Sequence, residues 1–343
     1  MLLDFSEMGI AVIGCGSIGQ RHARNLRKLC AAELLLVDPL IERAASLSDE
    51  LDAAFFDSTE PALAEGPEIA LICAPTSMHL AVASKALRSG CHLFIEKPLA
   101  ECAEGVGSLI EAAEARGRVL LVGYNFRFDP VLNYVRAWLR DGSIGKIVSA
   151  RFHFGSHLPS RHPWEDYRTG YGACRELGGG VILDAIHELD MACWLFGEPE
   201  TVYCAGGTFS ELEINVEDTA EIVMDYPDKV VSVHLDFVGR PAERWCEIIG
   251  TEGRIQADFF AREARYFDAE SGKWNEAENC GSIEETYELE MRHLLECVGS
   301  KARPIVDGRE ALKSLRLAEK AKESLHTGLP AAVQIPALTA YAR

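Results

Sequence analysis

The sequence lacks any run of apolar residues long enough to cross a membrane. A membrane-spanning helix needs about 20 consecutive apolar residues, and the most apolar helical segment, residues 181–196, contains three carboxylates and a histidine. Residues 1–8 contain no basic residue and no small-residue cleavage site, so they do not match a signal peptide. We therefore expect a soluble, cytoplasmic protein without a membrane partner.

Positive charge is also scarce. The chain has 34 Lys and Arg residues against 53 Asp and Glu residues, which gives a formal net charge of -19. Such a chain repels the phosphate backbone of nucleic acids, so we expect no nucleic-acid partner. The 11 cysteines form no Cys-x-x-Cys pair, which argues against a zinc knuckle or a redox dithiol. We expect buried, reduced cysteines and no metal site.

Length and pattern indicate two domains. The chain has 343 residues, more than the roughly 100–200 residues of a usual domain. Residues 1–127 alternate short aliphatic runs with helix-length amphipathic segments, which is typical of βαβ units around a parallel sheet. The runs predicted to be strands are residues 10–13, 34–37, 53–56, 69–73, 92–95 and 119–122. This order predicts a dinucleotide-binding domain.

The pattern changes in residues 128–343. A predicted helix over residues 131–139 and a strand over 147–154 precede an irregular segment, and several strands then follow without intervening helices. These strands are residues 202–205, 219–224, 230–237, 245–249 and 254–258, and the helices predicted after them are 284–298 and 308–325. Strands in succession favour an α/β domain with a large open, mostly antiparallel sheet.

A glycine-rich turn follows the first predicted strand. Gly14, Gly16 and Gly19 have the spacing Gly-x-Gly-x-x-Gly, in which the first glycine allows a tight turn, the second admits a pyrophosphate and the third allows close packing. Asp38 ends the second strand, about 20 residues further on, where a carboxylate can bind ribose hydroxyls. A carboxylate there repels the extra phosphate of NADP, so NAD is favoured. Arg43 is better explained as an exposed helix charge than as a phosphate ligand.

Lys97 and a polar helix supply candidate catalytic groups. Lys97 follows the fifth strand, at the edge where open α/β sheets bind their ligands, and the proline after it restricts its backbone to an extended conformation. Three glycines at 178–180 precede a predicted helix that carries Asp184, His187 and Asp190 at three-residue steps, on one face. These groups form either a structural network or an active site. A metal site there is disfavoured, because no partner motif occurs elsewhere.

Six motifs together resemble the Gfo/Idh/MocA oxidoreductases, a family that includes glucose-fructose oxidoreductases and inositol dehydrogenases. The motifs span residues 14–22, 74–79, 96–98, 123–128, 178–190 and 248–253. The resemblance covers nearly the whole chain and implies an N-terminal Rossmann domain followed by an α/β domain, whose open sheet forms the contact of a homodimer or homotetramer. It also implies hydride transfer between a nicotinamide and a carbon of a sugar, cyclitol or sugar acid.

The resemblance further implies a set of site residues. The cofactor-binding positions are Gly14, Gly16, Ser17, Ile18, Gly19, Asp38, Ala74, Pro75, Thr76, His79, Glu96, Lys97 and Asn125. Lys97, Asp184 and His187 surround the reacting hydroxyl as catalytic and substrate-binding residues, and Tyr124 and Arg127 also contact the substrate. In much of the family the Asp precedes the His by four residues. Here it precedes the His by three, which puts the role of Asp184 in question.

The segment before the three glycines is rich in arginine and aromatic residues. Residues 151–175 contain four Arg and no Lys against two acidic residues, a local positive excess in an acidic chain. We expect Arg161 and Arg168, with Trp164 nearby, to contact the substrate and bind its carboxylate or phosphate. The alternative is a surface loop with salt bridges to its own carboxylates, those of residues 165 and 166. The segment also resembles family members from pathways of sialic-acid-like sugars.

These features predict an NAD-dependent dehydrogenase acting on CH-OH donors. His187 would take the hydroxyl proton, Lys97 would stabilise the alkoxide, and hydride would pass to the nicotinamide. Two alternatives stay open. One is a non-catalytic NAD-binding regulator or sensor, which the presence of both Lys97 and His187 argues against. The other is an enzyme with tightly bound NAD that runs a closed redox cycle on a glycoside.

Overall fold

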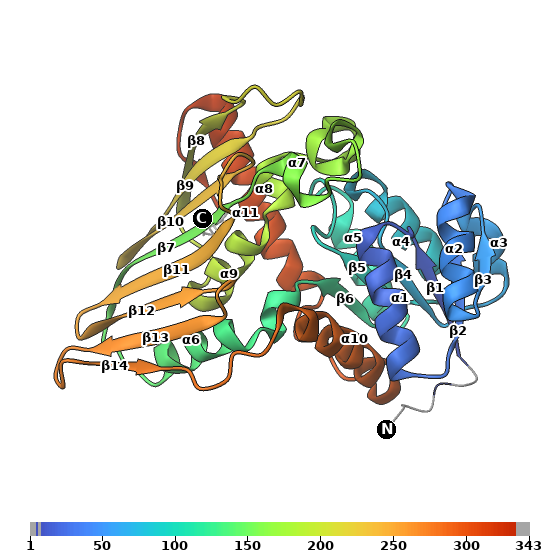
Figure 1. Ribbon diagram of the computed structural model, residues 1–343, viewed down its shortest axis with the longest axis horizontal. Coiled ribbons are helices and arrows are strands. Elements are labelled where there is room, and N and C mark those ends of the chain that lie inside the picture. The colour runs from blue at the N-terminus through green and yellow to red at the C-terminus, as the bar shows by residue number, and fades with distance from the viewer. Residues whose placement is uncertain (1–4, 6–7, 334–343) are drawn as a thin grey trace, which may run out of the picture. The chain divides into compact units, whose positions relative to one another are not determined.

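The computed structural model describes residue 5 and residues 8–333 of the chain. They form two compact units. The first comprises the residues up to 129 with 176–178 and 281–315, and the second comprises 130–175, 179–280 and the residues from 316 onward. Each unit contains one sheet (Figure 1). Every helix in the described ranges is too short or too polar to cross a membrane.

The first unit is built on a six-stranded parallel sheet. The strands are β1 (Gly9–Ile13), β2 (Glu33–Val37), β3 (Ala54–Phe56), β4 (Ile69–Ile72), β5 (His92–Glu96) and β6 (Leu120–Gly123). Their order is β3-β2-β1-β4-β5-β6, and each neighbouring pair is parallel. This is the strand order of a doubly wound dinucleotide-binding domain, so the Rossmann prediction is confirmed.

Helices connect these strands and cover the sheet. They are α1 (Ser17–Leu29), α2 (Ile41–Leu51), α3 (Thr59–Ala64), α4 (His79–Arg88) and α5 (Val106–Ala115), and a later helix, α10 (Ile283–Ser300), belongs to the same unit. α10 packs against α1 and buries Met291 and Leu294 in one apolar core with Ile10 and Leu36. Sequence analysis grouped this helix with residues 128–343. The structure packs it with the first unit, because its apolar face completes that core.

The second unit is built on a nine-stranded sheet. The strands are β7 (Ile147–Gly155), β8 (Thr201–Gly207), β9 (Thr219–Tyr226), β10 (Lys229–Asp236), β11 (Glu243–Gly250), β12 (Gly253–Asp258), β13 (Glu263–Asp268), β14 (Lys273–Glu276) and β15 (Ala331–Ala332). Their order is β14-β13-β12-β11-β7-β10-β9-β8-β15. Within this sheet β7 and β10 pair in parallel, and the other pairings between its described strands are antiparallel. The mostly antiparallel sheet is therefore confirmed.

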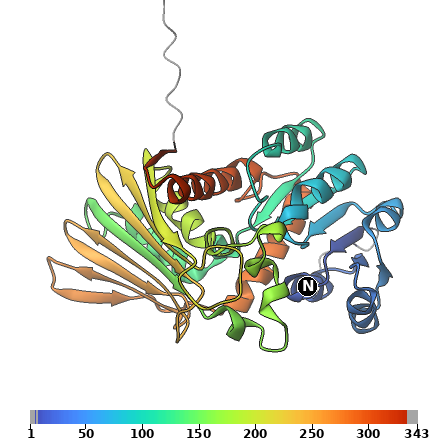
Figure 2. The same ribbon diagram turned by 90° about the horizontal axis from the view of Figure 1, so that it is seen from above.

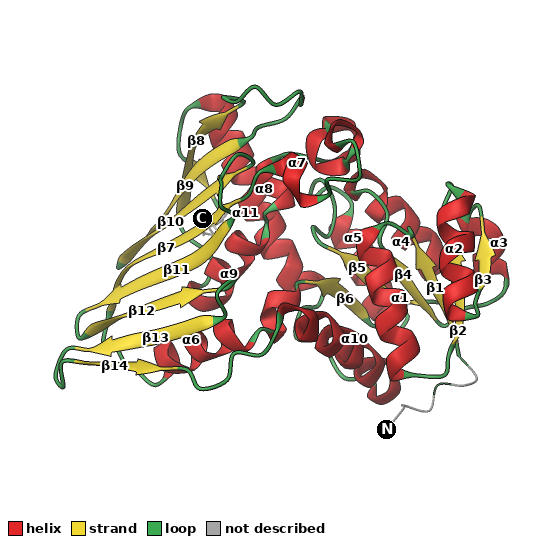
Figure 3. Ribbon diagram, in the orientation of Figure 1, coloured by secondary structure: helices red, strands yellow, loops and turns green. Residues whose placement is uncertain are grey.

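One face of this sheet packs against helices and the other does not. The contacting helices are α6 (Pro130–Arg140), α8 (Val181–Asp184) and α9 (His187–Phe196). Figures 2 and 3 show these helices on one side of the sheet, and on the opposite side, which we call the outer face, no helix of the described unit is drawn. Side chains along these strands alternate between the face covered by helices and the outer face. Phe152, Ile222 and Val233 belong to the covered face and are buried. The use of the outer face as a subunit contact stays a prediction.

The remaining elements are short or bridge the two units in sequence. They are α7 (Leu158–Arg161), α11 (Gly308–Thr327) and 3-10 turns over residues 76–78, 125–128, 167–169, 171–173 and 175–177. The eleven cysteines all lie in described ranges, and eight of them are buried. These eight pack as small apolar core residues, as their scattered positions indicate.

Candidate active site

The glycine turn between β1 and α1 has the shape that a dinucleotide needs. Gly14 has a φ of +99°, and a Cβ there would lie 2.5 Å from the Cys73 carbonyl oxygen. A Cβ on Gly19 would lie 1.8 Å from the Gly14 oxygen, so both positions require glycine. Nothing lies within 4 Å of a Cβ built on Gly16. The turn thus leaves open space beside its backbone at the start of α1, where Ser17 and Ile18 begin the helix, and a pyrophosphate fits such a position.

Asp38 is fixed beside this turn by backbone amides. Its Oδ2 accepts a hydrogen bond of 2.8 Å from the Cys15 nitrogen, and its Oδ1 accepts one of 2.9 Å from the Leu40 nitrogen. The carboxylate is therefore held in one orientation at the end of β2, as a ribose ligand requires. Burial, together with the negative charge of Asp38, raises the pKa of the Cys15 thiol to about 12. Cys15 is consequently a neutral packing residue and not a nucleophile.

His79 lies between two loops at the same edge of the sheet and contacts both. Its Nε2 lies 2.8 Å from the Ala74 carbonyl oxygen after β4, and its Nδ1 lies 2.8 Å from the Pro98 carbonyl oxygen after β5. The side chain is 1 % exposed. His79 was predicted to bind the cofactor. These contacts hold the backbone at Ala74 and Pro98, and a part of His79 in cofactor binding stays a prediction.

Lys97 is half-buried, and its backbone is held by a buried polar network. The Lys97 nitrogen donates to Glu96 Oε2 at 3.0 Å, and Glu96 Oε1 lies 2.6 Å from His22 Nε2 on α1. Glu290 on α10 is fully buried next to this pair, and burial, followed by the charge of Glu96, raises its pKa well above the usual value. Sequence analysis assigned no role to His22 or Glu290, because nothing in their spacing joins them to the Lys97 segment.

The turn after β6 places three further predicted residues in the interior. Tyr124 and Arg127 are buried, and Asn125 Nδ2 donates to Thr286 Oγ1 on α10 at 2.8 Å. The part of Tyr124 and Arg127 in substrate binding, and of Asn125 in cofactor binding, stays a prediction.

In the second unit, Asp184 lies in a compact polar cluster. Its Oδ2 accepts a hydrogen bond of 2.5 Å from Arg161 Nη1, and its Oδ1 accepts one from the Tyr171 hydroxyl. The Arg161 guanidinium carbon lies 5.0 Å from the ring centroids of both Phe154 and Phe237. Arg161 is thus a fixed counter-ion of Asp184 packed between aromatic rings. Sequence analysis did not single out Tyr171, although it lies in the aromatic-rich segment.

The prediction of one continuous helix after the three glycines is wrong. α8 ends at Asp184, and α9 begins at His187, because Ala185 has a ψ of 34°, outside the helical range. The two side chains therefore do not follow one helical repeat. The last of the three glycines is required by its own backbone conformation and surroundings. Gly180 has a φ of +108°, and a Cβ there would lie 2.3 Å from Glu217 Oε1. His187 and Asp190 are buried on α9, as their place in an apolar helix predicts.

The exposed loop around Arg168 satisfies its own charges. Arg168 donates from Nε and Nη2 to Asp166, at 2.8 and 2.9 Å, and from Nη1 to Glu213 at 2.8 Å. The surface-loop alternative predicted salt bridges to Glu165 and Asp166. The structure shows the pair with Asp166, and Glu213 takes the place of Glu165. Trp164 is 74 % exposed. Substrate binding by Arg168 and Trp164 stays a prediction.

Both units match sequence families. Residues 8–124 match the oxidoreductase family with an NAD-binding Rossmann fold, and residues 132–256 match the Gfo/Idh/MocA C-terminal domain. The chain belongs to the Gfo/Idh/MocA oxidoreductase family. The motifs that carried the resemblance in sequence lie in both matched regions, so the family prediction is confirmed.

Members of this family with similar sequences have different named activities. The chain is 29 % identical over 334 residues to a myo-inositol 2-dehydrogenase of Thermotoga maritima, an alignment that covers 93 % of this chain and 96 % of the relative. It is 27 % identical over 256 residues to a 2,7-anhydro-N-acetylneuraminate hydratase of Escherichia coli, which covers 72 % and 66 %. The structure of the WlbA dehydrogenase from Bordetella pertussis, in complex with NADH and UDP-GlcNAcA, superposes with a TM-score of 0.82 at 22 % identity and covers 96 % and 98 %.

Proposed function

We propose that this chain is an NAD-dependent dehydrogenase that acts on a hydroxyl-bearing carbon of a sugar, cyclitol or sugar acid. The proposal depends chiefly on the glycine turn, which is open at Gly16 and closed at Gly14 and Gly19 beside the fixed carboxylate of Asp38. The inositol dehydrogenase relative supports the substrate class. Bound at this turn, NAD supplies a hydride acceptor.

The residues around Asp38 support NAD over NADP. The carboxylate accepts hydrogen bonds from ribose hydroxyls and repels a 2′-phosphate. Pro39 and Leu40, which follow it, carry no positive charge, and Arg43 is exposed on α2. A phosphate at this position would therefore face a fixed anion without a compensating cation.

The catalytic roles fall on Lys97 and His187. An imidazole is the side chain best suited to take a hydroxyl proton near neutral pH, and an ammonium group stabilises the alkoxide that remains. The Glu96–His22 pair fixes the backbone of Lys97, so that only its side chain has to move. Asp184 already has Arg161 and Tyr171 as partners, and we assign it a positioning role.

A closed redox cycle is the second candidate function, and the hydratase relative favours it. The name of this hydratase describes net addition of water, which is a reaction without net oxidation. The hydratase aligns with 72 % of this chain. A chain of this kind would oxidise and re-reduce one substrate while its NAD stays bound. The sensor alternative has no comparable support, since Lys97 and His187 are both retained.

Melting temperatures and NADH absorbance separate these functions. We expect NAD to raise the melting temperature more than NADP does, because Asp38 repels the additional phosphate. A panel of polyols, aldoses, uronates and amino sugars is then screened for NADH in solution. Free NADH with one of them supports the dehydrogenase, whereas substrate conversion without free NADH supports the closed cycle. Absence of stabilisation by either dinucleotide would contradict the cofactor site itself.

A further inference from the structure

A group of metal-ligating side chains that was given no role above lies on the outer face of the nine-stranded sheet. His234 on β10 is directly opposite His153 on β7 in the parallel pairing. Two residues further along, Asp236 on β10 is opposite Gly155 on β7. Neighbours in register point to the same face, so the two histidines and the aspartate converge beside a position that has no side chain. We call His153, His234 and Asp236 the His153 cluster.

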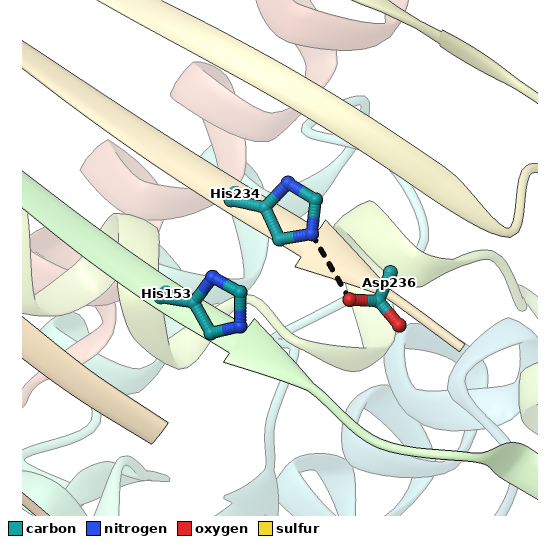
Figure 4. A group of neighbouring side chains, drawn as sticks. All are labelled: His153, His234 and Asp236. Carbon is teal, nitrogen blue, oxygen red and sulfur yellow. Dashed lines mark hydrogen bonds and ion pairs between the residues drawn. The ribbon is translucent and has the colours of Figure 1, made fainter. Parts of the chain in front are cut away.

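The distances within the His153 cluster suit a single ion. His234 Nε2 lies 2.9 Å from Asp236 Oδ2, and one ligand atom from each of the three residues lies within 4.8 Å of the others (Figure 4). Glu243 on β11, in register with Gly155, brings its Oε2 to 3.9 Å from His153 Nε2. Two imidazole nitrogens and one carboxylate oxygen are thus grouped for one cation, with the Glu243 carboxylate beside His153.

Gly155 leaves the space that such an ion needs. A Cβ built on Gly155 would lie 2.5 Å from Asp236 Oδ2 and 3.3 Å from His153 Nε2. Any other residue at this position would therefore fill the gap between two of the ligand atoms. The glycine itself is in an ordinary strand, without a positive φ that would require it.

Contacts to the atoms that face away from the cluster orient two of its ligands, as in protein metal sites. Glu221 Oε1 on β9 lies 2.5 Å from His234 Nδ1, which leaves Nε2 for the cluster. Asp236 Oδ1 accepts from the nitrogens of Val238 and Gly239, at 2.8 and 2.5 Å, which leaves Oδ2 for the cluster. A carboxylate behind a ligating histidine fixes its tautomer and raises its affinity for a metal.

In the single chain, the side chains of the cluster are partly exposed. The side chains of His153 and His234 are 22 % and 27 % exposed, and that of Asp236 is 9 % exposed. Trp245 on β11 covers the other side of His153, with ring centroids 5.0 Å apart and planes at 3°. Without a metal, the hydrogen bonds that the His234 ring donates to Asp236 and Glu221 raise the pKa of His234 to about 8. A proton is therefore the competing occupant that a metal has to displace.

We infer that the His153 cluster, with Glu243 in reach, binds a divalent transition metal ion, with Zn²⁺ the best fit to two imidazoles and carboxylate oxygens. Mg²⁺ and Ca²⁺ are disfavoured, since they prefer sites made of oxygen alone. The ion would join β7 to β10, and β11 through Glu243, and would stabilise the folded second unit. Sequence analysis expected no metal site, because the ligands come from separate strands.

The test uses the full chain, purified without a metal-affinity tag, treated with a chelator and titrated with Zn²⁺ by calorimetry. We expect one equivalent to bind and to raise the melting temperature. Co²⁺ should give the absorption of a tetrahedral nitrogen-and-oxygen site without thiolate charge-transfer bands, which separates this site from the cysteines. The absence of stoichiometric binding, or thiolate bands at the first equivalent, would overturn the proposal.

Variants locate the ion. His153→Gln and His234→Gln should each remove the stoichiometric binding, and Glu221→Gln should weaken it by about tenfold, because Glu221 only orients a ligand. The matched control is His157→Gln, whose ring is occupied by Ser160 and Arg240, and it should bind Zn²⁺ as the original chain does. Unchanged affinity in both cluster variants would contradict the site. Circular dichroism of each variant confirms that the sheet is intact before titration.

Discussion

The glycine turn of the first unit and the His153 cluster of the second differ in how far apart in sequence their parts lie. At the turn, backbone amides of Cys15 and Leu40 fix Asp38, and the open space results from a glycine, all within a few residues of two strand ends. In the cluster, backbone amides also hold Asp236, but the ligands come from separate strands, and only the sheet register brings them together. A site made by backbone within one βαβ unit is visible in sequence, whereas a site made by register is not.

A second contrast holds between Lys97, to which we assign a catalytic role, and Asp184, to which we assign a positioning role. Lys97 depends on the buried Glu96–His22 pair, which acts on its backbone. Asp184 is itself held by side chains, Arg161 and Tyr171. Replacement of Lys97 should therefore leave its support intact, whereas replacement of Asp184 would leave the Arg161 guanidinium partly buried without its carboxylate.

The largest expected effect is on catalysis. Lys97→Ala and His187→Ala should each lower kcat by about 10²- to 10⁴-fold, the usual contribution of a positioned acid or base, with the Kd for NAD nearly unchanged. Steady-state rates and NAD titrations measure the two quantities. Lys85→Ala, at an exposed lysine paired with Glu60, is the control that should leave both unchanged. Retained turnover in either variant would remove that residue from the mechanism.

A matched pair of substitutions separates the two roles of the glycine turn, which are cofactor binding and close packing. Gly16→Ala adds a Cβ into open space, so it should fold with an unchanged melting temperature and lose most of the stabilisation by NAD. Gly19→Ala places a Cβ 1.8 Å from the Gly14 oxygen, so it should lower the melting temperature even without NAD. Thermal unfolding with and without NAD measures both. NAD stabilisation that survives in Gly16→Ala would contradict a pyrophosphate at that position.

Much of the first unit could be predicted from sequence because its signals are local. The sequence predicts all six strands, and every one except β3 is a mostly buried aliphatic run between turns, as is typical of parallel strands. β13 and β14 in the second unit were missed. Both lie toward one edge of the sheet and alternate or expose their side chains, as in β14, where all four residues are exposed. Such strands lack the apolar run that distinguishes a strand from a loop.

The candidate site could be predicted only in part, for the same reason. Gly14, Gly16, Gly19 and Asp38 lie as their spacing predicts. The partner of Asp184 could not be found, because the Arg161 side chain reaches it across 23 residues of sequence. The break between α8 and α9 was also invisible, since the conformation of Ala185 is not determined by its own residue type.

A smaller effect should appear in stability and depend on pH. Burial keeps Glu290 protonated in the folded chain, whereas the unfolded chain ionises it at its ordinary pKa. The unfolded state therefore binds fewer protons, and this carboxyl lowers the free energy of unfolding as pH rises, by up to about 1.4 kcal/mol per pH unit between the two pKa values. Glu290→Gln should therefore gain stability relative to the original chain as the pH rises above the ordinary pKa of a glutamate, which a series from about pH 5 to pH 8 measures. Melting temperatures across that range, with the exposed Glu284→Gln as control, test this. A difference that does not grow with pH would contradict a buried neutral carboxyl.

The smallest expected effect concerns Arg168, where the sequence prediction and the observed contacts oppose each other. If Arg168 binds a substrate carboxylate or phosphate, Arg168→Ala should raise the KM for substrate by about tenfold, with the NAD constant unchanged. The value is modest because Asp166 and Glu213 already neutralise this exposed guanidinium. Lys146→Ala, an exposed lysine in the same unit, is the matched control. Equal changes in both constants, or none, would show that Arg168 only pairs with the carboxylates of its own surface, and that the local positive excess in sequence is cancelled by Glu213 from a distant segment.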